Sequence, residues 1–170
     1  MVTARNSRDD VVRAAGRLFA ARGYHGTSMR DLGKELGLLG SSLYAHVDSK
    51  QDLLVEVVEE GARLFEASAE KALAGEGTAA DRLEALIAGH VDVVVDNIEV
   101  ARTFLNEARM LGDDQRRRIL EARDHYENGF RSVIREGIAD GSFSSDTDPK
   151  TASILILSIL IIVVHKPLSS

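Results

Sequence analysis

The segment between Gly37 and Lys50 combines small residues with side chains that can contact phosphate. Small residues come first, at Gly40, Ser41 and Ser42. Longer polar side chains follow, at Tyr44, His46 and Lys50. A helix that enters the major groove of DNA must bring its N-terminal backbone close to base edges, so small residues there permit the approach and serine hydroxyls can bond to bases or phosphates. The longer side chains have the reach to contact the sugar-phosphate backbone and fix register.

Two short helices joined by a tight turn must position these residues. Ser28 and Asp31 have the spacing of a capping box, and Gly37 stands where a helix would end. A second short helix then carries Leu43 and Val47 on its apolar side. This pattern predicts a helix-turn-helix, although short helical hairpins with glycine turns also occur in proteins that never bind DNA.

The charge of the chain is unevenly distributed. The whole sequence has a net charge of -6, but residues 1–50 carry eight Lys and Arg against five Asp and Glu. The remaining 120 residues therefore hold 13 basic and 22 acidic side chains. A basic N-terminal segment on an acidic body indicates that this segment alone contacts a polyanion.

The stretch from Gly26 to Leu54, GTSMRDLGKELGLLGSSLYAHVDSKQDLL, resembles the DNA-binding segment of the TetR/AcrR family of repressors. The shared features are the Gly26-Thr27 pair, Gly33, Gly37 at the turn, Leu43-Tyr44, His46 and Ser49-Lys50. The resemblance implies contacts with the DNA backbone by Thr27, Tyr44, His46 and Lys50. It implies that Gly40, Ser41, Ser42 and Ala45 face the bases.

Three positions depart from the family pattern. Leu39 stands where a small polar residue usually caps the recognition helix, so the cap is expected to move to Ser41 or to be lost. Ala45 replaces a more usual aromatic residue or histidine, which favours an apolar contact such as a thymine methyl group. Val47 replaces a common phenylalanine, and we expect this change to affect core packing only.

Composition and motifs favour a globular protein without a catalytic site. The chain has 170 residues, 44% of them hydrophobic, and no cysteine, which suits a reducing cytoplasm. We find no signal peptide and no apolar run long enough for a membrane span. Five histidines show no metal-ligand spacing, and catalytic signatures are absent, so we expect no metal, no cofactor other than a small-molecule effector, and no enzyme activity. A helical enzyme remains an alternative.

Apolar periodicity predicts an all-α fold in which an N-terminal helix-turn-helix domain, residues 1–50, precedes a helical effector-binding and dimerisation domain, residues 51–170. One helix is expected to end at Gly23. Further helices follow over about 53–65, 83–94, 98–111 and 119–134, with a linker at 73–82. Asp148 as N-cap and Pro149 at the first helical position start a last helix that runs to about His165.

This last helix is apolar on nearly every side from Ile154 to Val164, which leaves one side for a partner chain. We expect Ile154, Leu157 and Ile161 at a homodimer interface. Members of the resembled family usually dimerise through their two final helices, and the resemblance implies one more helix at about the place where this sequence ends, at Ser170. A helical adaptor that dimerises through this helix without binding DNA is the alternative.

The resemblance also implies a small-molecule pocket in the helical body. Arg102, Asn106 and Arg109 share one helix face at spacings i, i+4 and i+7. Further candidates for effector contact are His90, Arg123, Tyr126 and Phe130. The alternative for the arginines is a solvated helix face, and for His90 a satisfied core histidine.

Residues 104–143 resemble the body of family members that sense lipid-catabolism intermediates, often acyl-CoA thioesters. Apolar side chains there could line an acyl slot, namely Phe104, Leu105, Leu111, Tyr126 and Phe130. Arg109, Arg123 or the run Arg116–Arg118 could meet the carrier phosphates. The sequence therefore predicts a dimeric repressor that binds a double-stranded, inverted-repeat operator and is released by an acyl-CoA, the competing effector being a hydrophobic drug or an uncharged metabolite.

Overall fold

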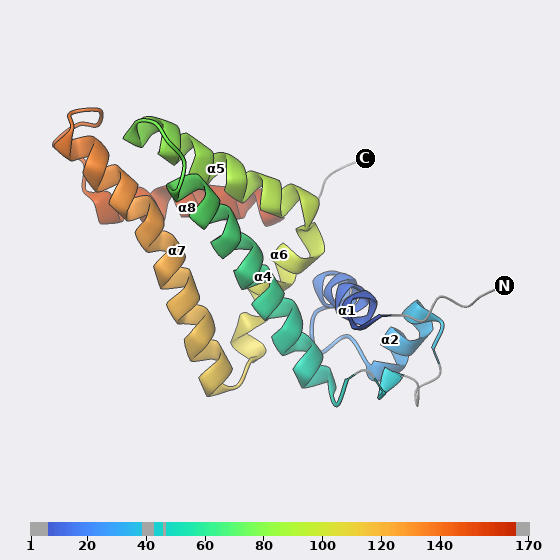
Figure 1. Cartoon of the computed structure of the whole chain (residues 1–170). Helices are drawn as coiled ribbons and strands as arrows, with labels where there is room; N and C mark the ends of the chain where they lie inside the picture. The colour runs from blue at the N-terminus through green and yellow to red at the C-terminus, as the bar shows by residue number, and fades with distance from the viewer. Residues whose placement is uncertain (1–6, 39–42, 46, 166–170) are drawn as a thin grey trace. The chain divides into compact units, whose positions relative to one another are not determined.

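The computed structural model describes residues 7–38, 43–45 and 47–165, with the backbone alone for 162–165. Within these ranges it is helical and contains no strand, which confirms the predicted all-α class. The helices in chain order are α1 (Arg8–Arg22), α2 (Met29–Leu36), α4 (Lys50–Leu73), α5 (Ala79–Asp96), α6 (Ile98–Glu107), the short 3-10 helix η1 (Ala108–Met110), α7 (Asp113–Ala139) and α8 (Pro149–His165) (Figure 1).

The chain divides into two compact units. The first consists of Met1–Gly61 and Glu99–Ile119, and the second of Ala62–Ile98 and Leu120–Ser170. Helices α4 and α7 each contribute residues to both units. The domain boundary predicted after residue 50 falls at the start of α4, whereas the first unit also takes in the beginning of α4, most of α6 and the start of α7.

The helix ends follow from local sequence. Ser28 caps α2 reciprocally with Asp31, since the Asp31 backbone N–H donates to Ser28 Oγ at 3.2 Å and the Ser28 N–H donates to Asp31 Oδ2 at 2.9 Å. The same device begins α5 at Thr78. Gly37 closes α2 with a φ of 65°, a left-handed conformation that suits glycine. These observations confirm the predicted boundaries of α2.

In the first unit, α6 packs closely against α1 and α4. The Thr103 hydroxyl is buried and donates to the Gly16 carbonyl of α1 at 3.2 Å. Phe104 lies directly over Gly61 of α4, where an added Cβ would stand 2.6 Å from Phe104 Cβ. Because glycine at position 61 has no Cβ, the Phe104 side chain of α6 can pack directly against the backbone of α4.

The second unit has its own apolar core, in which Leu86 of α5, Phe130 and Val133 of α7 and Leu160 of α8 are all buried. Helices α5 and α8 lie side by side (Figure 1). Leu157 is partly buried against this core.

Helix α8 has two distinct faces. Ser153 and Leu160 are buried on the inner face, and Ile156 and Leu157 pack against the core. Large apolar side chains on the outer face remain exposed, at Ile154, Leu155 and Ile159. The 100° helical period places Leu157 with the inner residues, so its predicted contact with a partner chain stays a prediction while its packing is against its own core. Among the residues described, no helix is both long and apolar enough to cross a membrane.

The two helix contacts of the first unit predict opposite effects of adding one methyl group. Gly61→Ala should lower the free energy of unfolding by about 1–3 kcal/mol, because the new Cβ overlaps Phe104. Gly16→Ala is the matched control, since its Cβ would meet Val57 and Val100 at ordinary distances of 3.5 and 3.6 Å. That variant should be neutral or more stable by up to about 1 kcal/mol. Urea denaturation of both variants checks the contrast, and equal stability would contradict the close α4–α6 packing.

Candidate functional site

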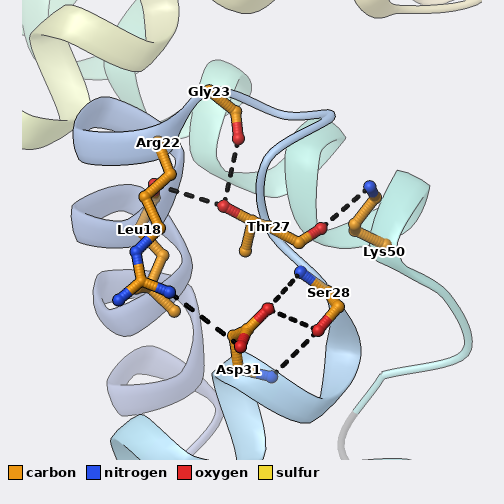
Figure 2. A network of polar contacts seen from close by, with 7 residues as sticks. All are labelled: Leu18, Arg22, Gly23, Thr27, Ser28, Asp31 and Lys50. Atoms are coloured by element: carbon orange, nitrogen blue, oxygen red, sulfur yellow. Dashed lines mark hydrogen bonds and ion pairs between the residues drawn. The ribbon is translucent and has the colours of Figure 1, made fainter.

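Thr27 anchors the connection between α1 and α2. Its side chain is only 2% exposed, and its hydroxyl lies within hydrogen-bond distance of the carbonyl oxygens of Leu18, at 3.2 Å, and Gly23, at 3.0 Å (Figure 2). A hydroxyl has one proton, so these two carbonyls share it. The Thr27 side chain is thus engaged inside the protein rather than presented to a phosphate, which differs from the role that the resemblance implied.

Lys50 closes the same connection from the start of α4. Its ammonium group donates to the Tyr24 carbonyl at 2.9 Å and to the Thr27 carbonyl at 3.0 Å, and it lies 4.0 Å from the centre of the Tyr24 ring. Figure 2 shows the bond to Thr27. An ammonium group has three donors, so one remains beyond these two carbonyls for a further acceptor.

Arg22, Ser28 and Asp31 complete this polar network. Arg22 at the end of α1 lies 3.9 Å from the Asp31 carboxylate in α2 (Figure 2). Hydrogen bonds from Ser28 lower the pKa of Asp31, and the positive charge of Arg22 lowers it further. The carboxylate therefore stays ionised and joins α1 to the first turn of α2.

Gln51 links this region to the segment after α6. The Tyr24 hydroxyl donates to Gln51 Oε1 at 2.8 Å, and Gln51 Nε2 donates to the Met110 carbonyl at 3.2 Å. Tyr24 also packs against Phe19 of α1, with ring centres 5.7 Å apart. Within the first unit, a continuous chain of contacts therefore joins the α1–α2 connection, the start of α4 and η1.

The predicted DNA contacts are only partly within the described residues. Tyr44 is 55% exposed and Ala45 is also exposed, so both are accessible from solvent. Leu43 and Val47 are buried, which agrees with a packing role for Val47. The predicted contacts Gly40, Ser41, Ser42 and His46 lie outside the described residues, as does Leu39.

An aromatic cluster fills the interior of the second unit. His90 of α5 is 3% exposed, its ring centre lies 4.8 Å from that of Phe65 in α4, and its Nδ1 lies 3.0 Å from the Tyr126 hydroxyl of α7. Tyr126 packs in turn against Phe130. Burial lowers the pKa of His90 to about 4 and raises the pKa of Tyr126. Both side chains are therefore uncharged at neutral pH.

A cavity of about 220 Å³ lies between α4 and α7 of the second unit. Its lining residues are Glu66, Ala69, Glu70, Leu73, His125, Tyr126, Asn128, Gly129 and Ser132. Tyr126 belongs both to this lining and to the aromatic cluster. No group of three or more His, Asp or Glu side chains among the described residues is arranged to hold a metal ion.

The predicted effector residues separate into two groups. His90, Tyr126 and Phe130 come together in the second unit, and Arg123 lies one turn before Tyr126 on α7, half-buried, so that burial lowers its pKa. Arg102, Asn106 and Arg109 belong to the first unit. There Arg109 and Asn106 are exposed and Arg102 is half-buried.

The arginine run at the start of α7 is neutralised by carboxylates. Its ion pairs are Arg116 with Asp113, Arg117 with Asp114 and Arg118 with Glu59. All three arginines are largely exposed. A phosphate bound here would have to compete with these pairs.

Three residues of these sites were missed by sequence reasoning. Phe65 was placed only at the end of a predicted helix, and neither Tyr24 nor Gln51 was singled out. For Phe65 a signal was available, because the chain has only five phenylalanines and three tyrosines, so each large ring is a candidate for the interior of the fold. Gln51 and Met110 are 59 positions apart, so no local spacing could have indicated their contact.

Two family profiles match the sequence. One, described as bacterial regulatory proteins of the tetR family, covers residues 11–57, and the other, described as a tetracyclin repressor-like C-terminal domain, covers residues 76–165. The transcriptional repressor KstR2 of Rhodococcus jostii is 30% identical over 147 residues, or 85% of this chain and 72% of that protein.

Solved structures show the same fold. The TetR-family regulator PfmR of Thermus thermophilus superposes with a TM-score of 0.86 at 29% identity, over 94% of this chain and 85% of PfmR. AibR, solved in complex with isovaleryl coenzyme A and operator DNA, superposes with a TM-score of 0.85 at 22% identity, over 98% of this chain and 90% of AibR. At that identity the likeness to AibR concerns the fold.

The buried imidazole predicts a pH dependence of stability. The His90 pKa is about 4 in the folded state, against about 6.5 in an unfolded chain, so the unfolded state binds more protons between these values. The free energy of unfolding should therefore fall by about 3 kcal/mol through this group as the pH drops from 6.5 to 4. Urea denaturation across this range should give a shallower pH dependence for His90→Phe than for the wild type. Parallel curves would contradict a buried neutral histidine.

Proposed function

Because this chain belongs to the TetR family of bacterial regulatory proteins, we propose that it is a ligand-responsive repressor that binds an inverted-repeat operator as a homodimer. The observation that carries this proposal is the network around Thr27 and Lys50, in the segment matched by the family profile. It fixes α1, α2 and the start of α4 together, and it leaves Tyr44 and Ala45 exposed between them. A rigid scaffold with an accessible segment is what docking to DNA requires.

The proposed mode of DNA binding is that of a helix-turn-helix. Gly40, Ser41, Ser42 and Ala45 are proposed to face the bases, and Tyr44, His46 and Lys50 the sugar-phosphate backbone. For Thr27, the buried hydroxyl supports a structural role in place of a contact with DNA. In a dimer, two such segments enter successive major grooves about 34–36 Å apart, which is why the operator is an inverted repeat.

We propose an acyl-CoA thioester as the effector. The aromatic cluster of Phe65, His90, Tyr126 and Phe130 supplies an apolar environment for an acyl chain, and Arg123 supplies a cation on the same face of α7 as Tyr126 and Phe130. The binding of isovaleryl coenzyme A by AibR, a protein of the same fold, supports this class of ligand. Such a protein acts where the DNA is, in the cytoplasm, and needs no catalytic activity of its own.

The outer face of α8 is the proposed dimer interface. Leu155 is 58% exposed and Ile159 is 64% exposed, and Ile154 lies beside them. Apolar side chains grouped in this way are covered when a second copy packs against them. We therefore propose that Ile154, Leu155 and Ile159 form the centre of the interface and that Ile161 lies at its edge.

Lys50 should contribute to DNA affinity without contributing to sequence preference. The test uses two kinds of duplex, those that the protein selects from a random library, which should contain inverted repeats, and unrelated ones. Lys50→Met should weaken binding to both kinds alike and lower the magnitude of the slope of log K against log salt by about 1, because one phosphate contact is lost. Fluorescence anisotropy at several salt concentrations measures both quantities.

Lys71→Met is the matched control, since Lys71 is an exposed lysine on the same helix but in the second unit. It should leave affinity and salt slope unchanged. The docking mode is wrong if Lys50→Met behaves like this control while remaining folded by circular dichroism.

A charge on the outer face of α8 should prevent dimerisation without unfolding the protomer. Ile159→Glu should sediment as a monomer, because dimer formation would bury the carboxylate among apolar side chains. Leu120→Glu is the control, since Leu120 is an apolar side chain that is 52% exposed but belongs to a different helix, α7. Sedimentation velocity that finds Ile159→Glu as dimeric as Leu120→Glu would move the interface elsewhere.

A further inference from the structure

We propose that the Nε2–H group of His90 donates a hydrogen bond to the carbonyl oxygen of an acyl thioester bound in the second unit. This inference rests on the proposed class of effector and assigns one atom of the protein to one atom of the ligand. It makes His90 a specificity-determining residue, because it distinguishes an acyl thioester from an alkyl chain that lacks the carbonyl group.

The first observation is an unsatisfied nitrogen in the protein interior. His90 Nε2 is buried and has no hydrogen-bond partner among the residues that the structure describes. The His90 ring as a whole is 3% exposed, so bulk water does not reach it. A buried polar group without a partner costs free energy, and such groups in native structures are generally explained by a ligand or a trapped water.

The second observation favours one position for the imidazole proton. Tyr126 Oη lies 3.0 Å from His90 Nδ1, and burial keeps the phenol protonated. The phenol proton requires an acceptor, and the neutral imidazole offers one nitrogen for that purpose. If Nδ1 accepts from Tyr126, the imidazole proton is on Nε2. In this tautomer the unsatisfied atom is a hydrogen-bond donor, and its missing partner is an acceptor.

The surroundings of His90 select an uncharged acceptor. The rings of Phe65 and Tyr126 pack against the imidazole, with centres 4.8 and 5.9 Å away. Apart from the Tyr126 hydroxyl, these two rings offer no polar atom that would help to hold a water molecule, which needs two to four partners. A carboxylate brought here would lose its hydration next to a neutral ring. A carbonyl oxygen at the end of an apolar chain meets both requirements.

The proposed approach of the ligand is from the α4–α7 side of the second unit. The cavity of about 220 Å³ between these helices shares Tyr126 with the aromatic cluster. Ala69, Leu73 and Gly129 give the cavity apolar walls. Because Tyr126 lines the cavity and also contacts His90, the cavity adjoins the position proposed for the carbonyl group.

Two CoA derivatives that differ by one carbonyl group test the proposal. Octanoyl-CoA is a thioester, and S-octyl-CoA is the corresponding thioether. Isothermal titration calorimetry on the full chain should show that the wild type binds octanoyl-CoA about 10-fold more tightly than S-octyl-CoA. His90→Phe should bind both with the same affinity. His25→Phe, which changes an exposed histidine of the first unit, should keep the wild-type ratio.

A second measurement does not depend on the folding of a variant. Nitrogen NMR of the wild type with labelled histidine should find the Nε2–H tautomer at His90, and its Nε2–H signal should shift with octanoyl-CoA and not with S-octyl-CoA. A structural histidine would not respond differently to the two probes.

Four results would overturn the inference. These are equal affinities of the wild type for the two derivatives, no binding of octanoyl-CoA, an Nδ1–H tautomer at His90, or a His90→Phe variant that keeps the 10-fold ratio. Binding of a selected duplex by the same preparation separates this outcome from the proposed function. If the duplex is bound and released by octanoyl-CoA while the His90→Phe ratio stays at 10, only the role of His90 is wrong.

Discussion

The hydrogen bonds from the Lys50 ammonium group to the carbonyls of Tyr24 and Thr27 determine how the DNA-binding part of the chain is held. Both acceptors belong to the connection between α1 and α2, and the donor is the first residue of α4. Backbone carbonyls that are partly withdrawn from water need partners, and here one charged group donates to two of them. Thr27 Oγ1 donates to the carbonyls of Leu18 and Gly23 at the end of α1. The conformation of the α1–α2 connection therefore depends on the side chains of Lys50 and Thr27.

Helix α4 has residues in both units of the chain. It begins with Lys50 and Gln51, which contact the α1–α2 connection and η1, and it continues into the second unit, where Phe65 packs against His90. A ligand that changes the packing around Phe65 therefore acts on a helix that also holds the DNA-binding segment. Such a ligand changes DNA affinity only if it binds one arrangement of α4 better than another, and the effect is then reciprocal.

The parts of the fold that were predictable from sequence are those with a local physical cause. Ser28 and Asp31 lie three residues apart and cap α2, and Gly37 ends it with a left-handed backbone. The acceptors of Lys50 are 26 and 23 positions away, and Tyr126 is 36 positions from His90. Such contacts depend on how helices pack, which no spacing rule reports. Leu157 shows the same limit, because an apolar residue on an apolar helix does not reveal which face meets its own chain.

The most direct test of a ligand-responsive repressor is the effect of octanoyl-CoA on the dissociation constant of a duplex that the protein itself selects. Fluorescence anisotropy at fixed salt should show this constant rising by about 5- to 150-fold at saturating octanoyl-CoA, the range typical of coupling between two sites. Free octanoate at the same concentration should raise it less, because it lacks the thioester and the carrier phosphates. An unchanged dissociation constant at saturating octanoyl-CoA would contradict the proposed effector and its coupling to DNA.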